Sequence, residues 1–96
     1  MREVHFYVTG RVQGVGYRAW CVKTALKLNL SGWVRNRFDG SVEVQAKGEE
    51  LFISEFLKAC QKGPAWAHVT ALTPITIPTA FLPLIEEGRF SQQPTV

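Results

Sequence analysis

The sequence predicts an α+β sandwich in which two helices pack on one face of a single mixed or antiparallel β-sheet. Segments with the two-residue period of strands and segments with the period of helices follow one another as strand–helix–strand–strand–helix–strand. The length of 96 residues favours one domain spanning residues 1–96. Hydrophobic residues make up 46% and charged residues 20% of the chain, which is the composition of a globular protein rather than a disordered one.

The first strand and the first helix are separated by a glycine-rich loop. Apolar side chains two residues apart predict a half-buried strand over residues 4–9. Residues 10–16 contain three glycines and are therefore expected to form a loop. From about Arg18 to Leu30 the apolar residues recur three and four apart, which predicts one face of a helix. We expect Gly32 to end this helix in the left-handed capping conformation.

The pair Asp39-Gly40 predicts a tight turn between two strands, at residues 33–37 and 41–46. Valine and alanine alternate with polar residues in the second of these strands. This alternation predicts that the apolar side chains face the core and that Glu43 is exposed.

The second half of the chain is expected to repeat the helix-then-strand arrangement. An apolar stripe predicts a helix from about Glu49 that ends at Gly63. Residues 69–77 are rich in β-branched side chains and predict a strand, although Pro74 interrupts it. Residues 88–92 weakly predict a short closing strand.

Charge and cysteine usage narrow the class of protein. The net charge is +3, made of +5 in residues 1–40 and −2 in residues 41–96, so an anionic ligand would be drawn to the first half. No stretch is apolar enough to span a membrane, and the N-terminal residues lack the pattern of a signal peptide. Cys21 and Cys60 lack a metal-binding spacing. We therefore expect buried, reduced thiols in a cytoplasmic protein.

The segment from Gly10 to Arg18 carries the strongest chemical signal in the sequence. A loop between a strand and a helix presents backbone N–H groups where the helix dipole is positive, and such a concavity binds phosphate or carboxylate. Glycines allow the backbone to approach the anion closely because they have no Cβ. Arg18 would lie in the first turn of the helix, where its planar guanidinium suits phosphate oxygens.

Two other interpretations of this loop compete with phosphate binding, a dinucleotide-binding motif and a tight turn without a ligand. Residues 14–19 also fit the dinucleotide-binding pattern GxGxxG/A, but the chain is too short for a doubly wound domain and a hairpin follows instead of a second helix. The phosphate-loop NTPase pattern is absent, because no Gly-Lys-Ser/Thr follows the glycines. The glycines could also serve only to allow a tight turn.

A second motif strengthens the phosphate interpretation. The segment Gly32–Glu43 places Asn36 at a strand leading into the hairpin, 18 residues after Arg18. Together with the loop at 10–18 and the later Gly-Pro-Ala-Trp-Ala of residues 63–67, it resembles the acylphosphatase family over roughly residues 3–72.

The resemblance implies a ferredoxin-like sandwich and a hydrolase that cleaves the carboxyl–phosphate anhydride of small acyl phosphates without a metal or other cofactor. By position, Arg18 matches the family's phosphate-binding arginine and Asn36 its water-orienting asparagine. The remaining matches are the backbone amides of the phosphate-binding loop, which belong to Gly14, Val15, Gly16 and Tyr17. We expect a monomer with no nucleic-acid or membrane partner.

The other polar and aromatic candidates are assigned structural roles. We expect His5 and His68 to be surface or hydrogen-bonded histidines rather than catalytic bases. Arg35 and Arg37 flank Asn36 on the opposite face of the strand, so we expect them to face solvent. The three tryptophans are expected to pack in or beside the core: Trp20, Trp33 and Trp66.

Two alternative functions belong to other classes. RNA-recognition domains share this element order and the calculated pI is about 9.1, but residues 41–46 carry no aromatic side chain for base stacking. A non-catalytic module that senses an anion with the same loop is the other alternative. An activity assay distinguishes it from an enzyme.

Overall fold

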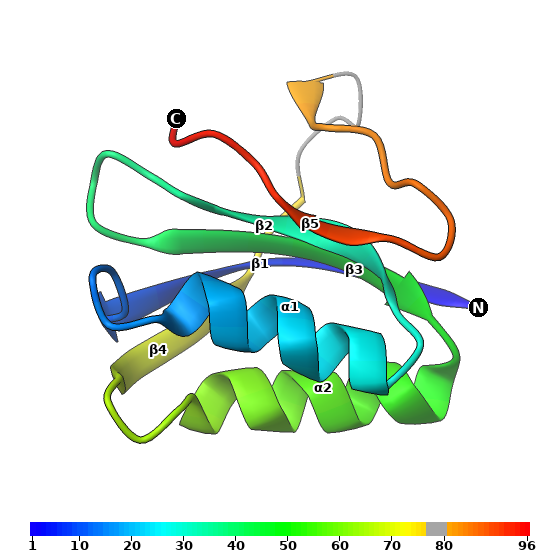
Figure 1. Ribbon diagram of the computed structural model, residues 1–96, viewed down its shortest axis with the longest axis horizontal. Coiled ribbons are helices and arrows are strands. Elements are labelled where there is room, and N and C mark those ends of the chain that lie inside the picture. Colours follow the sequence, from blue (N-terminus) through cyan, green and yellow to red (C-terminus); the bar gives the residue numbers. More distant parts are fainter. Residues whose placement is uncertain (77–80) are drawn as a thin grey trace.

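The computed structural model describes residues 1–76 and 81–96. Five strands form one sheet, and two helices cover one of its faces (Figure 1). This confirms the predicted class of fold. The elements in chain order are β1 (Arg2–Arg11), α1 (Tyr17–Lys27), β2 (Ser31–Asn36), β3 (Val42–Gly48), α2 (Glu50–Lys62), β4 (His68–Pro74) and β5 (Phe90–Gln92).

The strand order is β4-β1-β3-β2-β5. The first four strands pair antiparallel, whereas β5 runs parallel to β2, so the sheet is mixed. The predicted closing strand is thereby confirmed, at the edge beside β2. The predicted strand at 69–77 forms over His68–Pro74, and its last expected residue lies outside the described residues.

The core lies between the sheet and the helices, as the alternation in the sequence predicts. Its buried side chains come from β1, β2, β3 and β5 and from both helices. Phe56 of α2 contacts Phe6 of β1 and Phe90 of β5 edge to face, with ring centroids 6.3 and 5.8 Å apart. Each such pair contributes about 0.5–1.5 kcal/mol beyond the burial of its area. One aromatic ring thus joins α2 to a central strand and to the edge strand.

The two cysteines face this core, one from each helix. Cys21 and Cys60 are free and buried, which confirms the prediction. Burial raises the pKa of the Cys21 thiol well above its usual value, so this thiol stays protonated and unreactive. Neither described helix is long and apolar enough to cross a membrane.

The predicted capping role of Gly32 is wrong. Helix α1 ends at Lys27, and Asn29 adopts the left-handed conformation with φ of 56°. Gly32 lies instead within β2, where a Cβ added to it would stand 2.0 Å from the carbonyl oxygen of Gln45. The glycine is therefore needed because the backbone of β3 approaches β2 closely at this point.

The prediction that Glu43 is exposed is also wrong. Glu43 does face away from the helices, but its side chain has no exposed surface. Its carboxylate accepts hydrogen bonds from Arg35 Nε at 2.8 Å, Arg37 Nη1 at 3.0 Å and His5 Nε2 at 2.6 Å. The expected solvent-facing role of the two arginines is therefore wrong. The hydrogen-bonded role expected for His5 is confirmed.

Aromatic rings and the segment after β4 cover this second face of the sheet. The guanidinium carbons of Arg35 and Arg37 each lie 4.7 Å from the centroid of an aromatic ring, those of Trp33 and Tyr7 respectively. The Trp33 ring is fully buried, and its Nε1 donates to Gln45 Oε1 at 2.8 Å. The orange segment of Figure 1, which begins at residue 81, lies on this side of the sheet.

Of the remaining predictions for tryptophans and histidines, two are confirmed and one is wrong. Trp20 is partly buried and packs against the core, as expected. The predicted packing of Trp66 is wrong, because 77% of its surface is exposed in the turn before β4. His68 lies exposed at the edge strand, as expected.

The buried cluster predicts a specific acid sensitivity. Burial alone raises the pKa of Glu43, but the hydrogen bonds from Arg35, His5 and Arg37 outweigh it and hold the pKa below its usual value. A carboxyl group whose pKa is lower in the folded state stabilises the fold above its unfolded-state pKa of about 4.3. That contribution is lost as the pH falls through the folded-state pKa.

We therefore predict that Glu43→Gln lowers the free energy of unfolding by about 3 kcal/mol at pH 7, because the arginines lose their buried partner. Urea unfolding between pH 7 and pH 3 should show the difference from wild type shrinking below about pH 4. Glu55→Gln on the exposed side of α2 is the matched control and should change stability by less than about 0.5 kcal/mol. Equal effects of the two substitutions would contradict the prediction.

Candidate active site

The loop between β1 and α1 has a backbone shaped by two glycines. Gly14 and Gly16 have φ of 73° and 83°, in the left-handed region that residues with a Cβ rarely adopt. Gly16 is also the N-cap of α1 and offers no side chain to bond the first-turn amides. The first turn contains no acidic residue, whereas that of α2 contains Glu50. The positive end of the α1 dipole is therefore not compensated by a carboxylate of its own helix.

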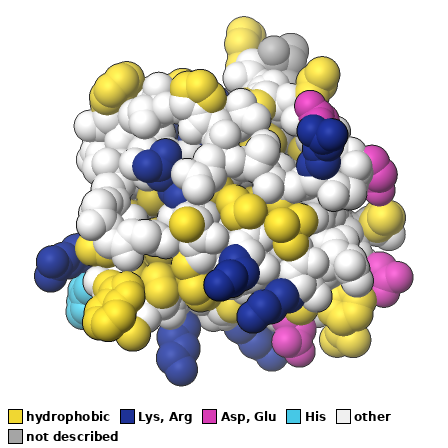
Figure 2. Space-filling view, viewed as in Figure 1, with side chains coloured by type: hydrophobic (Ala, Val, Ile, Leu, Met, Phe, Trp, Pro, Cys, Tyr) yellow, Lys and Arg dark blue, Asp and Glu magenta, His cyan; other side chains and the backbone are white. Residues whose placement is uncertain are grey.

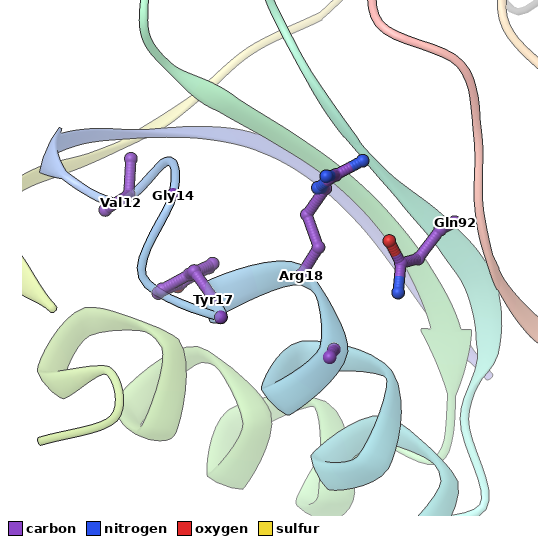
Figure 3. Close-up of a pocket in the computed structure, with 7 residues that line it drawn as sticks. Val12, Gly14, Tyr17, Arg18 and Gln92 are labelled. Carbon is purple, nitrogen blue, oxygen red and sulfur yellow. The ribbon is translucent and has the colours of Figure 1, made fainter. Parts of the chain in front are cut away.

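A small cavity lies at this end of α1. Its volume is about 140 Å³, which suits a small anion better than the ligands of 300–1,000 Å³ pockets. Figure 3 shows the loop, the first turn of α1 and β5 around it. The residues that line the cavity are Val12, Gly14, Gly16, Tyr17, Arg18, Ala19 and Gln92.

Arg18 supplies the positive charge of the cavity. Its side chain rises from the first turn of α1 toward the sheet (Figure 3). The ion pairs formed within residues 1–76 and 81–96 do not include Arg18, so no carboxylate neutralises it there. On the face shown in Figure 2, acidic side chains gather at the opposite end of the molecule from the loop. The arginine is thus available for an external anion.

The four loop residues expected to bind phosphate do not all line the cavity. Gly14, Gly16 and Tyr17 line the cavity, whereas Val15 is not among the lining residues and packs its side chain against the core. The side chain of Tyr17 is 1% exposed and its hydroxyl donates to the carbonyl of Cys60 at 2.8 Å. Burial raises the pKa of this phenol, so it stays neutral. The tyrosine therefore anchors the helix start to α2.

Asn36 lies at the end of β2 and does not line the cavity wall. Strand alternation places its side chain on the same face as the buried Val34, the face that carries the helices. The Asn36 Oδ1 atom is buried and has no hydrogen-bond partner within the described part of the chain. Its backbone carbonyl accepts from the Val96 N–H at 3.2 Å. The sheet thus holds the backbone and leaves the amide oxygen without an internal partner.

Gln13 is a positioning residue that sequence reasoning missed. Its Nε2 donates to the carbonyl oxygens of Arg37 and Ser41, both at 2.7 Å. These two carbonyls belong to the hairpin that follows Asn36, so one side chain joins the loop to the turn beside the second motif. The sequence signal that could have indicated this role is the single side-chain amide, Gln13, in a loop that otherwise contains glycines, one arginine and valines. Gln92 was missed as well, because it lies in the weakly predicted closing strand.

No group of three or more His, Cys, Asp or Glu side chains that could hold a metal ion occurs in residues 1–76 and 81–96. The polar groups that line the cavity are the loop backbone, the guanidinium of Arg18 and the side-chain amide of Gln92. The fold and the site together define a small α+β sandwich protein with a positively charged cavity at the start of its first helix.

Comparison with known proteins identifies the family. The sequence model of the Acylphosphatase family matches residues 4–80. An acylphosphatase of Rhodopseudomonas palustris is 49% identical over 85 residues, covering 88% of this chain and 86% of that protein. One from Moorella thermoacetica is 54% identical over 67 residues, covering 70% and 72%. The chain therefore belongs to the acylphosphatase family, whose members are hydrolases acting on acid anhydrides.

Solved structures agree with this assignment. The crystal structure of acylphosphatase from Bacillus subtilis superposes with a TM-score of 0.83 at 36% identity, covering 97% of this chain and 99% of that one. The HypF protein of T. kodakarensis matches with a TM-score of 0.78 at 30% identity, covering 97% of this chain but only 12% of HypF. The ferredoxin-like fold expected from the resemblance is thereby confirmed.

We predict that Gln13→Ala destabilises the protein by about 1–3 kcal/mol, because two partly buried hydrogen bonds of about 0.5–1.5 kcal/mol each are lost, although both carbonyls keep a backbone donor. Loosening the loop should also weaken binding of inorganic phosphate, measured by calorimetry at a temperature where the variant remains folded. Gln61→Ala on the exposed side of α2 is the control and should change neither quantity. Unchanged stability in Gln13→Ala would show that the link between loop and hairpin is dispensable.

Proposed function

We propose that this protein hydrolyses acyl phosphates, with the loop amides and Arg18 binding the phosphoryl group and Asn36 orienting the attacking water. The observation that carries the proposal is the presence of an uncompensated arginine and an uncapped helix start in one small cavity. Membership of the acylphosphatase family supports the same reaction class.

The leaving group explains how this reaction can proceed without a general acid. An acyl phosphate releases a carboxylate, whose conjugate acid has a pKa near ~4, so the departing oxygen needs no proton at neutral pH. Among the described residues, those that line the cavity accordingly include no carboxylic acid, histidine or lysine. The protein is left with two tasks, which are to stabilise charge on the phosphoryl group and to place the water.

Charge stabilisation falls to the loop and Arg18. Phosphoryl transfer passes through a loose transition state with negative charge spread over the three equatorial oxygens. Backbone N–H groups at the start of α1 and the forked guanidinium can donate to these oxygens from fixed positions. The left-handed backbone at Gly14 and Gly16 shapes the loop before the substrate arrives. Little reorganisation is then needed during the reaction.

Asn36 can hold a water but cannot deprotonate it, because an amide has no basic atom at neutral pH. Its buried Oδ1, which lacks a partner in the described chain, supports a role in accepting a hydrogen bond from that water. The water oxygen then bonds to phosphorus as the phosphorus–oxygen bond to the acyl group breaks. The acyl oxygen leaves as carboxylate, and the water proton passes to a phosphate oxygen.

In the proposed mechanism the loop recognises the phosphate and not the acyl group. Small acyl phosphates, including carbamoyl phosphate, fit the proposal equally. A monomeric, cytoplasmic protein that acts as one domain over residues 1–96 remains a prediction, which size-exclusion chromatography and cell fractionation can test.

The proposal predicts that Arg18→Ala lowers kcat/KM for benzoyl phosphate by about 10³-fold, through weaker binding and slower turnover. The assay is run in excess chelator to remove adventitious metal ions. Lys23→Ala, on the exposed part of the same helix, removes the same charge and should retain wild-type activity. Folded wild-type protein that binds phosphate but shows no hydrolysis would instead favour the anion-sensing module.

For Asn36→Ala we predict a fall in kcat of about 10²-fold with little change in the affinity for inorganic phosphate, because the substitution misplaces the water and leaves the loop intact. Competitive inhibition by phosphate measures the affinity, and thermal unfolding verifies the fold. A loss of phosphate affinity as large as the loss of kcat would place Asn36 among the phosphate ligands instead.

A further inference from the structure

We propose that Gln92 determines specificity for the acyl side of the substrate, by donating a hydrogen bond from its side-chain amide to the carbonyl oxygen of the acyl group. This inference rests on the proposed hydrolysis of acyl phosphates. It assigns a role to a residue of β5, which lies outside both motifs that the resemblance covers.

Strand pairing fixes the direction of the Gln92 side chain. Gln92 pairs with Val34 in the parallel β2–β5 ladder, and Val34 is fully buried on the helix side of the sheet. Residues opposite one another on adjacent strands point to the same face, so Gln92 also points to the helix side. There it lines the cavity together with Arg18 and Ala19. Figure 3 shows its amide extending from β5 toward Arg18.

The amide of Gln92 differs from the other glutamine amides that line the site or the sheet. Gln13 bonds two backbone carbonyls, Gln45 accepts from Trp33, and Gln93 donates to Ser91 Oγ at 3.1 Å. No side-chain hydrogen bond within residues 1–76 and 81–96 uses the amide of Gln92. Its donor is therefore available to a ligand in the cavity.

The position of Gln92 relative to the loop decides which part of the substrate it meets. The loop amides and Arg18 form one side of the cavity and together can satisfy the phosphoryl oxygens. Gln92 approaches from the edge strand on the other side of Arg18 (Figure 3). An acyl phosphate has one further strong acceptor, its carbonyl oxygen, adjacent to the bond that breaks.

A neutral donor at the carbonyl oxygen accelerates the reaction as well as binding the substrate. As the bond between phosphorus and the acyl oxygen breaks, negative charge spreads over both carboxylate oxygens by resonance. The carbonyl oxygen is then a better acceptor in the transition state than in the bound substrate, so the hydrogen bond lowers the barrier. Alkyl and aryl phosphate monoesters lack this oxygen. Gln92 therefore favours acyl phosphates over monoesters.

The experiment compares Gln92→Leu with Gln93→Leu, its neighbour on the opposite face of the same segment. Hydrolysis of benzoyl phosphates with substituents that vary the pKa of the leaving benzoic acid is measured for each variant. The inhibition constant of inorganic phosphate is measured alongside, because phosphate has no acyl group. Thermal unfolding verifies that each variant is folded.

We expect Gln92→Leu to lower kcat by about 10- to 100-fold while the inhibition constant of phosphate stays within about twofold of wild type. The rate should also depend more steeply on the leaving-group pKa, because the variant no longer stabilises the departing carboxylate. Gln93→Leu should match wild type in all three quantities.

Two results would overturn the inference while leaving the proposed function intact. One is a Gln92→Leu variant that is as active as Gln93→Leu. The other is a phosphate inhibition constant that rises as much as kcat/KM falls, which would assign Gln92 to the phosphoryl group. Wild-type protein that binds phosphate without hydrolysing any benzoyl phosphate would overturn both proposals at once.

Discussion

The buried carboxylate of Glu43 constrains more of this molecule than any other group. It lies in β3, the central strand, and removing such a charge from water costs several kcal/mol unless donors surround it. Those donors come from both neighbouring strands, His5 from β1 and Arg35 from β2. A slip of either strand by one residue would turn its donor to the other face. The cluster therefore favours one register on each side of β3.

The Glu43 cluster is also linked to the candidate site, through the hairpin between β2 and β3. Arg37 donates to Glu43 with its side chain, and its carbonyl accepts from Gln13 in the loop before α1. The outer face of the sheet thus helps to fix the turn, the turn holds the loop, and the loop presents its amides at the helix start. Asn36 is the residue directly before Arg37, so both motifs depend on one short segment.

In the proposed mechanism most of the groups that bind phosphate belong to the backbone. A loop amide is positioned by φ and ψ, so the informative residues are those that allow unusual backbone angles, Gly14 and Gly16. Arg18 then adds charge from a side chain. The proposed mechanism therefore needs few ionisable residues near the cavity, and the sequence indicates it mainly through a pattern of glycines.

The sequence predicted the parts of the molecule that local pattern controls. Alternation gave the faces of β1 and β3 correctly, and Asp39-Gly40 marked the hairpin, because strand period and turn geometry are properties of a few neighbouring residues. The environment of Glu43 was not predictable in this way. Its burial depends on His5, Arg35 and Arg37, which come from outside β3 and do not alter the local pattern.

The same distinction applies to the candidate site. Arg18 and the glycines lie in one contiguous motif between a strand and a helix, so the sequence alone could place most of them around one cavity. Gln92 enters the cavity only because β5 pairs with β2, a contact between distant parts of the chain. The prediction for Trp66 was wrong for a related reason, since its large apolar side chain lies in a turn that the helices and strands of the described residues leave 77% exposed.

The order of the strands also bears on how quickly the chain folds. Leu72 pairs with Val8, and Phe90 pairs with Gly32, so both outer strands join partners that are far away along the chain. The entropy of closing such long loops is lost before the contacts that compensate for it have formed. Mixed α/β domains fold at rates between those of helical bundles, which need microseconds to milliseconds, and those of all-β folds, which need milliseconds to seconds. The cavity takes one wall from an edge strand that pairs with a distant part of the chain, so it is complete only when these two parts have met.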